Sequence, residues 1–571
     1  MSFNGIVVSA GIAFGKALIM TSQTPPLDFK LLSAEQIKQQ QQQLTHGIEL
    51  LIHHLQHCQR HLCQECDNFQ LIDADIMLLE DDGLQQQLHQ HIEQFKVSAA
   101  VAIDRIFNQQ AAELASLDDP YLANRSGDIL CLSKRLISAL HGHLQSDLST
   151  LTDDTILLAD DLTPAEFAIL PLKHIKGIVL ESGGLTSHTA ILARAAGIPA
   201  LLNYPFSKRL VPISDGEQLV LDGMTGELHI APCEELFAKL KQKHIQELQR
   251  RQALTAYKDK PSITIDGHHV TLLANVGNLS EISHATDVGA QGIGLFRTEF
   301  LLMNAKALPN EQQQYKLYCD ALHSLHGQIL SIRTFDIGAD KEIPCLEQTH
   351  EDNPAMGIRG IRYSLAHPNT FITQVKAILR AANHGPIRLM FPMVSQIEEL
   401  EGALALIEQA KAQLIEQEKG FGELMLGIVV ETPAAVLNLP SMLPLLDFVS
   451  IGTNDLTQYT LAADRTNPNL AKQYPALSPA VIQLILMTIT YCKQANVNVS
   501  LCGELGSDPQ VLGLLVGLGL DEISINPTHL LEVKAALVNG RYQDFVKHAH
   551  TITTLTRIED ICLAISAVND N

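Results

Sequence analysis

The chain has 571 residues, of which 63 are acidic and 40 basic, and its formal net charge is −23. At roughly 150 residues per domain, this length predicts about four domains, or three if one of them is a large barrel. Hydrophobic residues make up 46% of the chain, which suffices for several cores and excludes wholesale disorder. The acidic balance argues against a nucleic-acid-binding protein, which needs a basic surface.

The cysteines and the apolar runs indicate the cellular compartment of the protein. The ten cysteines follow no disulfide framework, so in a chain of this length they favour reduced thiols and a cytoplasmic protein. No apolar run is long enough for a transmembrane helix. The first basic residue is Lys16, so the start of the chain does not resemble a signal peptide.

Residues 1–20 are expected to form short strands broken by glycines. Apolar residues then recur at helical spacing, which predicts an α-helical subdomain over residues 21–145. Residues 146–232 alternate short strands with helices and are expected to join residues 1–20 in one small α/β domain, so that the helical subdomain is an insertion. The charged stretch 233–261 predicts a helical linker.

From residue 262 to residue 571 strand and helix patterns alternate. The candidate strands are Val270–Asn275, Gly292–Leu295, Ile329–Arg333, Ile387–Pro392, Leu426–Val430, Phe448–Ile451, Val497–Cys502 and Glu522–Ile525. Eight βα units of this length predict a (β/α)8 barrel of the TIM type. Polar residues follow several strand ends, and in a barrel they would converge on one mouth: Arg297, Arg333, Glu431, Asn454, Asp455 and Cys502.

Two groups among these residues suggest chemistry. Guanidinium groups match carboxylate and phosphate oxygens, so Arg297, Arg333 and Arg359 favour a small anion with several charges. Glu431 and Asp455 each follow a candidate strand, and two carboxylates together with substrate oxygens are a common way to hold Mg²⁺. Two carboxylates far apart in the sequence are a weak metal signal on their own.

Four stretches resemble a known family: Val430–Ala435, Ile451–Tyr459, Asp464-Arg465 and Cys502–Glu504. They resemble the phosphoenolpyruvate-utilising enzymes, and within that family the enzyme I group of the bacterial phosphotransferase system. The resemblance extends over essentially the whole chain. It implies a phosphoenolpyruvate-binding barrel, a swivelling phosphohistidine domain and an inserted helical subdomain that binds the phosphocarrier HPr. The implied reaction moves the phosphoryl group of phosphoenolpyruvate to a histidine of the enzyme and then to HPr, which starts sugar phosphotransfer.

The resemblance also implies roles for the residues of the barrel. Mg²⁺ is expected on Glu431 and Asp455, and Cys502 is expected to protonate the enolate carbon to give pyruvate. The residues expected to bind phosphoenolpyruvate, or to lie beside it, are Arg297, Arg333, Asn454, Asp455, Arg465, Arg359 and Lys341. Relatives of this kind form dimers through the barrel, so a homodimer is expected here.

The stretch 183–199 is the most informative part of the smaller domain. Two glycines and a capping Thr186 or Ser187 precede an alanine-rich helix, which places His188 in the first helical turn. Free N–H groups and the helix dipole favour a phosphate there and disfavour an imidazolium ion. A single histidine at a helix start more often caps the helix or faces solvent. The resemblance identifies His188 as the phosphohistidine, with Thr163 as its support.

Three positions depart from the family pattern. Leu185 stands where many enzyme I sequences have arginine, Ala339 replaces a glycine, and Asp75 replaces a histidine in the expected carrier-binding stretch. These departures suggest a paralogue with a non-standard carrier. The apolar residues near Asp75 are expected, with equal weight, to contact the carrier or to pack in the core: Ile76, Met77 and Leu84.

A histidine- and cysteine-rich stretch at residues 53–66 is not explained by the family. It consists of His53, His54, His57, Cys58, His61, Cys63 and Cys66. Four of these share one helix face and could bind Zn²⁺ or Ni²⁺. Four tetrahedral ligands rarely come from one straight helix, so a polar face of a Gln/His-rich helix is the favoured interpretation.

Two other functions fit the sequence less well. Pyruvate phosphate dikinase and phosphoenolpyruvate synthase share the barrel and the phosphohistidine domain, but they need a nucleotide-binding domain. Residues 21–145 are too few for one and contain no P-loop-like stretch. A regulatory phosphorelay protein without turnover is disfavoured, because every candidate catalytic position is present.

Overall fold

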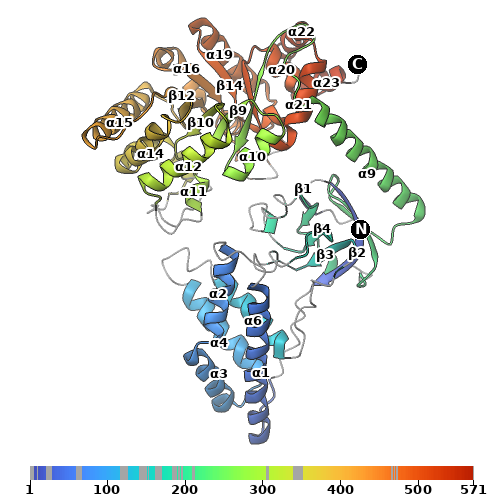
Figure 1. The fold of residues 1–571 in the computed structure, drawn as a ribbon. Helices are drawn as coiled ribbons and strands as arrows, with labels where there is room; N and C mark the ends of the chain where they lie inside the picture. Colours follow the sequence, from blue (N-terminus) through green and yellow to red (C-terminus); the bar gives the residue numbers. More distant parts are fainter. Residues whose placement is uncertain are drawn as a thin grey trace. The chain divides into compact units, whose positions relative to one another are not determined.

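The computed structural model divides into two compact units, residues 1–249 and residues 250–571 (Figure 1). The described residues are 5–9, 11–20, 29–59, 67–115, 126–140, 151, 153–160, 162, 167, 170–182, 189–190, 193, 197–208, 213–303, 308–337, 351–464, 467, 470 and 473–569. None of the helices in these ranges has the length and apolarity needed to cross a lipid bilayer.

A seven-stranded sheet forms the centre of the first unit. Its strands are β1 (Ile6–Ser9), β2 (Ile12–Met20), β3 (Thr155–Ala159), β4 (Ile175–Leu180), β5 (Ala200–Leu202), β6 (Gln218–Asp222) and β7 (Glu227–Ile230), in the order β1-β5-β4-β3-β2-β6-β7. Strands β2 to β5 are parallel, whereas β1, β6 and β7 join antiparallel. Alternate residues of β3 enter different apolar clusters, Leu157 on one face and Ile156 on the other, so both faces of the sheet are covered.

The helices of this unit are inserted into the sheet. They are α1 (Ala34–Gln59), α2 (Asp67–Leu79), α3 (Asp82–Phe95), α4 (Ala99–Ala115) and α6 (Ser126–Leu140). All of them lie in sequence between β2 and β3, yet Lys16 of β2 pairs directly with Thr155 of β3. Their own core contains Leu44, Leu55 and Phe107, all fully buried. The helical block therefore has a core separate from that of the sheet, as an insertion requires.

Helix α9 (Glu234–Leu254) follows the last strand of the sheet. Its first half packs on the sheet, where Leu240 meets Ile12 and Val220. Lys243 also donates a 2.7 Å hydrogen bond to the buried Asp222 of β6. Only Leu240 is fully buried along the whole helix, which agrees with the charged helix predicted for this stretch.

The second unit is a closed barrel of eight parallel strands. They are β8 (Thr271–Val276), β9 (Gly292–Arg297), β10 (Ile329–Arg333), β11 (Ile387–Phe391), β12 (Met425–Val430), β13 (Phe448–Ile451), β14 (Asn498–Leu501) and β15 (Glu522–Ile525). Each strand pairs with the next, and β15 closes the ring on β8. The predicted (β/α)8 barrel is confirmed, with its eight strands within a residue or two of their expected positions.

Helices surround the barrel (Figure 1). They are α10 (Leu279–Asp287), α11 (Phe300–Met303), α12 (Glu311–Ser324), α13 (Ile361–Ala366), α14 (Pro368–Ala381), α15 (Ile397–Glu416), α16 (Pro433–Met442), α17 (Thr453–Leu461), α19 (Pro479–Ala495), α20 (Leu512–Gly517), α21 (Leu530–Asn539), α22 (Tyr542–Thr553) and α23 (Ile558–Asn569). Side chains also fill the interior, where Leu295, Met390, Val429 and Phe448 form a cluster with Cys502. A Cβ atom at Gly427 would lie 2.5 Å from the Phe448 ring, so a glycine there makes room for the ring.

Candidate active site

Charged side chains converge at the carboxyl end of the barrel. Arg333 is the last residue of β10, Glu431 follows β12, and Asp455 lies in the first turn of α17, after β13. Cys502 follows β14, and Arg359 precedes α13. Because all eight strands run the same way, the residues after their ends meet at one mouth, which is where TIM-barrel enzymes place their active sites.

Arg333 is buried among three carboxylates. Its Nη2 donates a 2.6 Å hydrogen bond to Oε1 of Glu299, and its Nη1 lies 3.2 Å from Oδ2 of Asp336. The same nitrogen lies 3.6 Å from Oε1 of Glu431. Burial disfavours the charged guanidinium, but these carboxylates outweigh it and raise the pKa of Arg333. The side chain is therefore a fixed positive charge.

Arg359 is held in the same way from the other side of Asp336. Its Nε and Nη2 donate to the Asp336 carboxylate over 3.0–3.3 Å. Its Nη1 donates to Oδ1 of Asp455 at 3.0 Å and to the Tyr459 hydroxyl at 3.1 Å. Asp336 therefore bridges Arg333 and Arg359, which fixes the spacing of the two guanidinium groups.

Each of the two candidate metal ligands accepts a hydrogen bond that orients its carboxylate. Oε2 of Glu431 accepts a 2.9 Å hydrogen bond from the Met393 amide, and Oδ1 of Asp455 accepts the bond from Arg359. Gly452 leaves space for Glu431, because a Cβ atom there would lie 2.7 Å from Cγ of Glu431. Carboxylates that bind metal ions are usually oriented by hydrogen bonds of this kind.

Buried carboxylates outnumber buried guanidinium groups at this end of the barrel. Among the buried residues described there, the carboxylates are Glu299, Asp336, Glu431 and Asp455, and the guanidinium groups are Arg333 and Arg359. Burial, and then the charge of Asp455, raise the pKa of Glu431. A divalent cation would reduce the repulsion among these carboxylates, and carboxylate oxygens are the ligands that Mg²⁺ prefers. The residues present thus fit the expected metal.

Cys502 lies inside the barrel mouth. Its side chain is 6% exposed, and its Sγ lies 3.7 Å from the Ile451 carbonyl oxygen. Burial raises the pKa of the Cys502 thiol to about 11. The thiol is therefore protonated at neutral pH and can donate that proton to a reacting carbon. A Cβ atom at the next residue, Gly503, would lie 1.8 Å from Oγ1 of Thr453, so the glycine allows this loop to approach α17.

Of the remaining predicted residues, some lie at the barrel mouth and others are outside the described part of the chain. Arg297 ends β9 in register with Arg333, and Oδ1 of Asn454 accepts a 3.1 Å hydrogen bond from the Glu504 amide. Other residues singled out in the sequence lie outside the described residues: Thr163, Leu185, His188, Ala339, Lys341 and Arg465. Thr189, which follows His188, is buried, and its hydroxyl donates a 2.6 Å bond to the Leu162 carbonyl.

Sequence reasoning assigned no role to Glu299, Asp336 or Tyr459. Each lies inside a stretch that drew attention for another residue, namely Arg297, Arg333 and Asp455. For Glu299 and Asp336 the available signal was a carboxylate within three residues of the end of a barrel strand, a position at the mouth.

The structure of the helical subdomain tests the expected carrier contacts and the possible metal site. Ile76 and Leu84 are buried in its core, which excludes them as surface contacts, whereas Met77 is 67% exposed. Asp75 forms a 3.4 Å ion pair with Arg135 of α6. In the part of the 53–66 stretch that the structure describes, and elsewhere among the described residues, no three His, Cys, Asp or Glu side chains are arranged to hold a metal ion.

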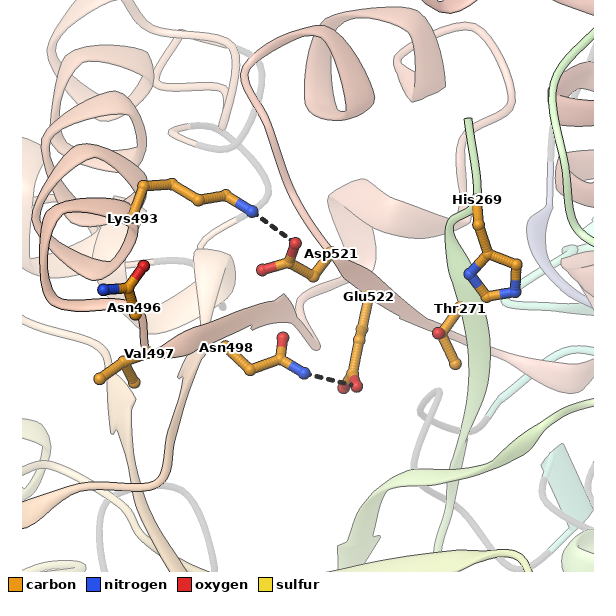
Figure 2. Close-up of a pocket in the computed structure, with 8 residues that line it drawn as sticks. All are labelled: His269, Thr271, Lys493, Asn496, Val497, Asn498, Asp521 and Glu522. Atoms are coloured by element: carbon orange, nitrogen blue, oxygen red, sulfur yellow. Dashed lines mark hydrogen bonds and ion pairs between the residues drawn. The ribbon is translucent and has the colours of Figure 1, made fainter. Parts of the chain in front are cut away.

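A pocket of about 440 Å³ opens at the opposite end of the barrel, at the amino ends of β8, β14 and β15 (Figure 2). Lys493 pairs with Asp521 there, and Asn498 donates a 2.9 Å hydrogen bond to Glu522. Glu522 also accepts hydrogen bonds from both Nη groups of Arg388, at 2.6 and 3.0 Å. Residues at this end of such barrels serve stability, and catalysis is placed at the other end.

Three family models match successive parts of the chain. They describe PEP-utilising enzymes: the N-terminal domain over residues 4–125, the mobile domain over residues 151–226 and the PEP-binding domain over residues 251–542. Phosphoenolpyruvate-protein phosphotransferase of Haemophilus influenzae is 36% identical over 544 residues, covering 95% of this chain and 94% of the relative. The protein of the same name from Mycoplasma pneumoniae is 38% identical over 491 residues, covering 86% and 85%. That of Staphylococcus carnosus is 37% identical over 472 residues, covering 82% of each chain.

Proposed function

The chain belongs to the family of PEP-utilising enzymes, and on that premise we propose that it is a phosphoenolpyruvate–protein phosphotransferase. It takes the phosphoryl group of phosphoenolpyruvate onto His188 and passes it to a histidine of HPr or an HPr-like carrier. The observation that carries the proposal is the buried network of Arg333, Arg359, Glu431 and Asp455 at the barrel mouth. Its pattern of two cations and excess carboxylates suits a trianionic substrate together with a divalent metal.

The first step is phosphoryl transfer at the mouth of the barrel. A neutral imidazole nitrogen of His188 attacks phosphorus, and the bond between phosphorus and the enol oxygen breaks, which leaves the enolate of pyruvate. Arg333 and Arg359 hold the transferring group, joined by Arg297, Arg465 and Lys341. Mg²⁺, held by Glu431 and Asp455, supplies charge neutralisation when bound.

The second step is protonation of the enolate. Cys502 gives its thiol proton to the methylene carbon, a carbon–hydrogen bond forms, and pyruvate leaves. The thiolate that remains regains a proton from water. The raised pKa of Cys502 supports this role, since the thiol reaches the step in its protonated form.

The phosphohistidine then reaches the carrier. In this proposal residues 1–20 and 146–232 form the phosphohistidine domain, residues 21–145 bind the HPr-like carrier, and the domain swivels on the linker 233–261. Covalent storage on His188 splits one difficult transfer into two. We also propose that the protein works in the cytoplasm as a homodimer through the barrel 262–571. No disulfide joins the cysteines in the described part of the chain, as is usual for proteins of that compartment.

The deciding experiment is incubation of the full chain with phosphoenolpyruvate and Mg²⁺, followed by intact mass spectrometry. We expect the gain of one phosphoryl group and release of an equal amount of pyruvate, both abolished by His188→Ala. Failure to gain the group, or a gain that survives this substitution, would contradict the proposal. Adding a standard HPr then tests the carrier: transfer at an ordinary rate would exclude a non-standard partner.

A further inference from the structure

Tyr459 links the short 3₁₀ turn Pro354–Met356, which precedes α13, to a candidate metal ligand. It lies on α17 one turn after Asp455, so both side chains are on the same side of the helix. Its hydroxyl oxygen accepts a 3.1 Å hydrogen bond from Nη1 of Arg359, and its hydroxyl proton is donated to the Ala355 carbonyl. Nη1 of Arg359 also donates to Asp455. A continuous hydrogen-bonded chain therefore runs from Ala355 to Asp455.

The contacts of Arg359 show what Tyr459 contributes. The guanidinium is buried, with its Nε and Nη2 engaged by Asp336 and its Nη1 shared between Asp455 and Tyr459. Asp336 fixes one edge of this planar group, but Nη1 needs two acceptors if both of its protons are to be bonded. Without the Tyr459 hydroxyl, one buried donor would lose its partner and the group could tilt away from Asp455.

We propose that Tyr459 is a positioning residue for the metal site, acting on Asp455 through Arg359. This inference rests on the proposed assignment of Asp455 to Mg²⁺. Groups that hold a metal ligand in place usually change metal affinity by about 10–100-fold when they are removed. Tyr459 acts one residue further out, so its removal weakens Mg²⁺ binding by about 3–10-fold.

The test is calorimetric titration of Mg²⁺ into the full chain in the absence of phosphoenolpyruvate. Tyr459→Phe is expected to weaken Mg²⁺ binding by about 3–10-fold, while the melting temperature falls by no more than about 6 °C. In turnover assays the Mg²⁺ concentration for half-maximal rate rises by the same factor, while kcat at saturating Mg²⁺ stays within about twofold. Tyr315→Phe is the matched control: it removes a hydroxyl that bonds His384 at 2.9 Å on the outside of the barrel, and Mg²⁺ affinity should not change.

A double-mutant cycle with Arg359→Lys separates positioning from a general structural effect. If Tyr459 acts through Arg359, adding Tyr459→Phe to Arg359→Lys causes no further loss of Mg²⁺ affinity. Wild-type affinity in Tyr459→Phe, or two losses that multiply, would overturn the proposal. Wild-type protein that binds Mg²⁺ but takes no phosphoryl group would overturn the proposed function alone. Wild-type protein that takes the phosphoryl group but binds no Mg²⁺ without phosphoenolpyruvate would overturn the role of Tyr459 alone.

Discussion

The backbone N–H of Met393 donates a 2.9 Å hydrogen bond to Oε2 of Glu431 from a left-handed conformation, with φ of 64°. A non-glycine residue in this region is strained, and such strain persists where the surrounding structure imposes it. The Met393 side chain is 1% exposed, so its packing contributes to holding the backbone there. The barrel therefore keeps Glu431 oriented at the cost of backbone strain and of a buried negative charge.

The first prediction concerns Glu431→Gln. Burial and the charge of Asp455 raise the pKa of Glu431, so its ionised form destabilises the metal-free fold above its ordinary pKa. A glutamine carries no charge and can still accept the Met393 bond. We expect the metal-free variant to melt about 2–4 °C higher than wild type at pH 8, with the difference shrinking as pH falls toward 5. Phosphoryl transfer should fall by at least about 100-fold.

Saturating Mg²⁺ should reverse this order of stability, since only wild type gains full binding energy. Differential scanning calorimetry with and without Mg²⁺ measures both effects. A metal-free variant that melts below wild type would show that Glu431 stabilises the fold by its charge. In that case the stabilising partner would be Arg333, which lies 3.6 Å from Glu431. Arg333 would still have its ion pairs with Glu299 and Asp336 in the variant.

The second prediction concerns the reactivity of Cys502. With its pKa raised to about 11, the thiolate fraction is small at pH 8 and rises about tenfold per pH unit up to pH 10. Alkylation by iodoacetamide should therefore be slow at pH 8, rise with that slope, and be far slower than at the exposed Cys562. Peptide mass spectrometry over a pH series measures both rates. Rapid modification of Cys502 at pH 7 would contradict a protonated, buried donor.

The barrel could be predicted from sequence because its signals are local. Each strand is a short apolar run bounded by turn residues, and burial on both faces of a parallel barrel requires such runs. Arg333 and Asp455 could be found for a related reason, since a charged residue at the end of a buried strand, or a few residues after it, is unusual. The family motifs then gave these residues roles.

The contacts within the site could not be predicted in the same way. Asp336 bridges Arg333, its near neighbour, and Arg359, which reaches the site from a different loop. Which carboxylate meets which guanidinium depends on strand register and on side-chain rotamers, which a sequence pattern does not specify. The role of Tyr459 could not be predicted for the same reason. Its helical spacing from Asp455 can be read from the sequence, but its hydrogen bond to Arg359 joins distant parts of the chain.

The third prediction is a test of barrel stability at Glu311, on the outer helix α12. Burial disfavours its charge, but hydrogen bonds from Lys419, Lys376 and Arg380 outweigh this and lower its pKa to about 2. A lowered pKa contributes stability that is complete above the ordinary pKa of about 4.3 and is lost as pH falls toward 2. Glu311→Gln should cost about 3 kcal/mol at pH 7, with a smaller difference at pH 3.

The control for Glu311 is Glu408→Gln on α15. Glu408 forms a 2.9 Å pair with Lys411, but its side chain is 70% exposed, and exposed pairs contribute within about 1 kcal/mol. Urea unfolding of the barrel at pH 7 and pH 3 compares the two variants with wild type. Equal losses at both pH values would show that Glu311 acts through packing instead of through its charge.

The last prediction separates stability from catalysis at the two ends of the barrel. Glu522 and Arg388 form a buried two-point ion pair at the amino ends of β15 and β11, away from the mouth. Removing one partner leaves the other charge buried and unpaired, which costs about 3–5 kcal/mol. Glu522→Ala should therefore lower the melting temperature of the barrel by about 6–10 °C, while kcat/KM at 25 °C stays within about threefold.

Lys493→Met is the matched control in the same pocket. Lys493 pairs with Asp521, but both side chains are partly exposed, at 47% and 36%, and Asp521 keeps a 3.2 Å hydrogen bond from the Val499 amide. We expect its melting temperature to change by no more than about 2 °C. If Glu522→Ala instead abolished turnover without a thermal shift, the amino end of the barrel would have a functional role, and the pocket of Figure 2 would be the place to seek it.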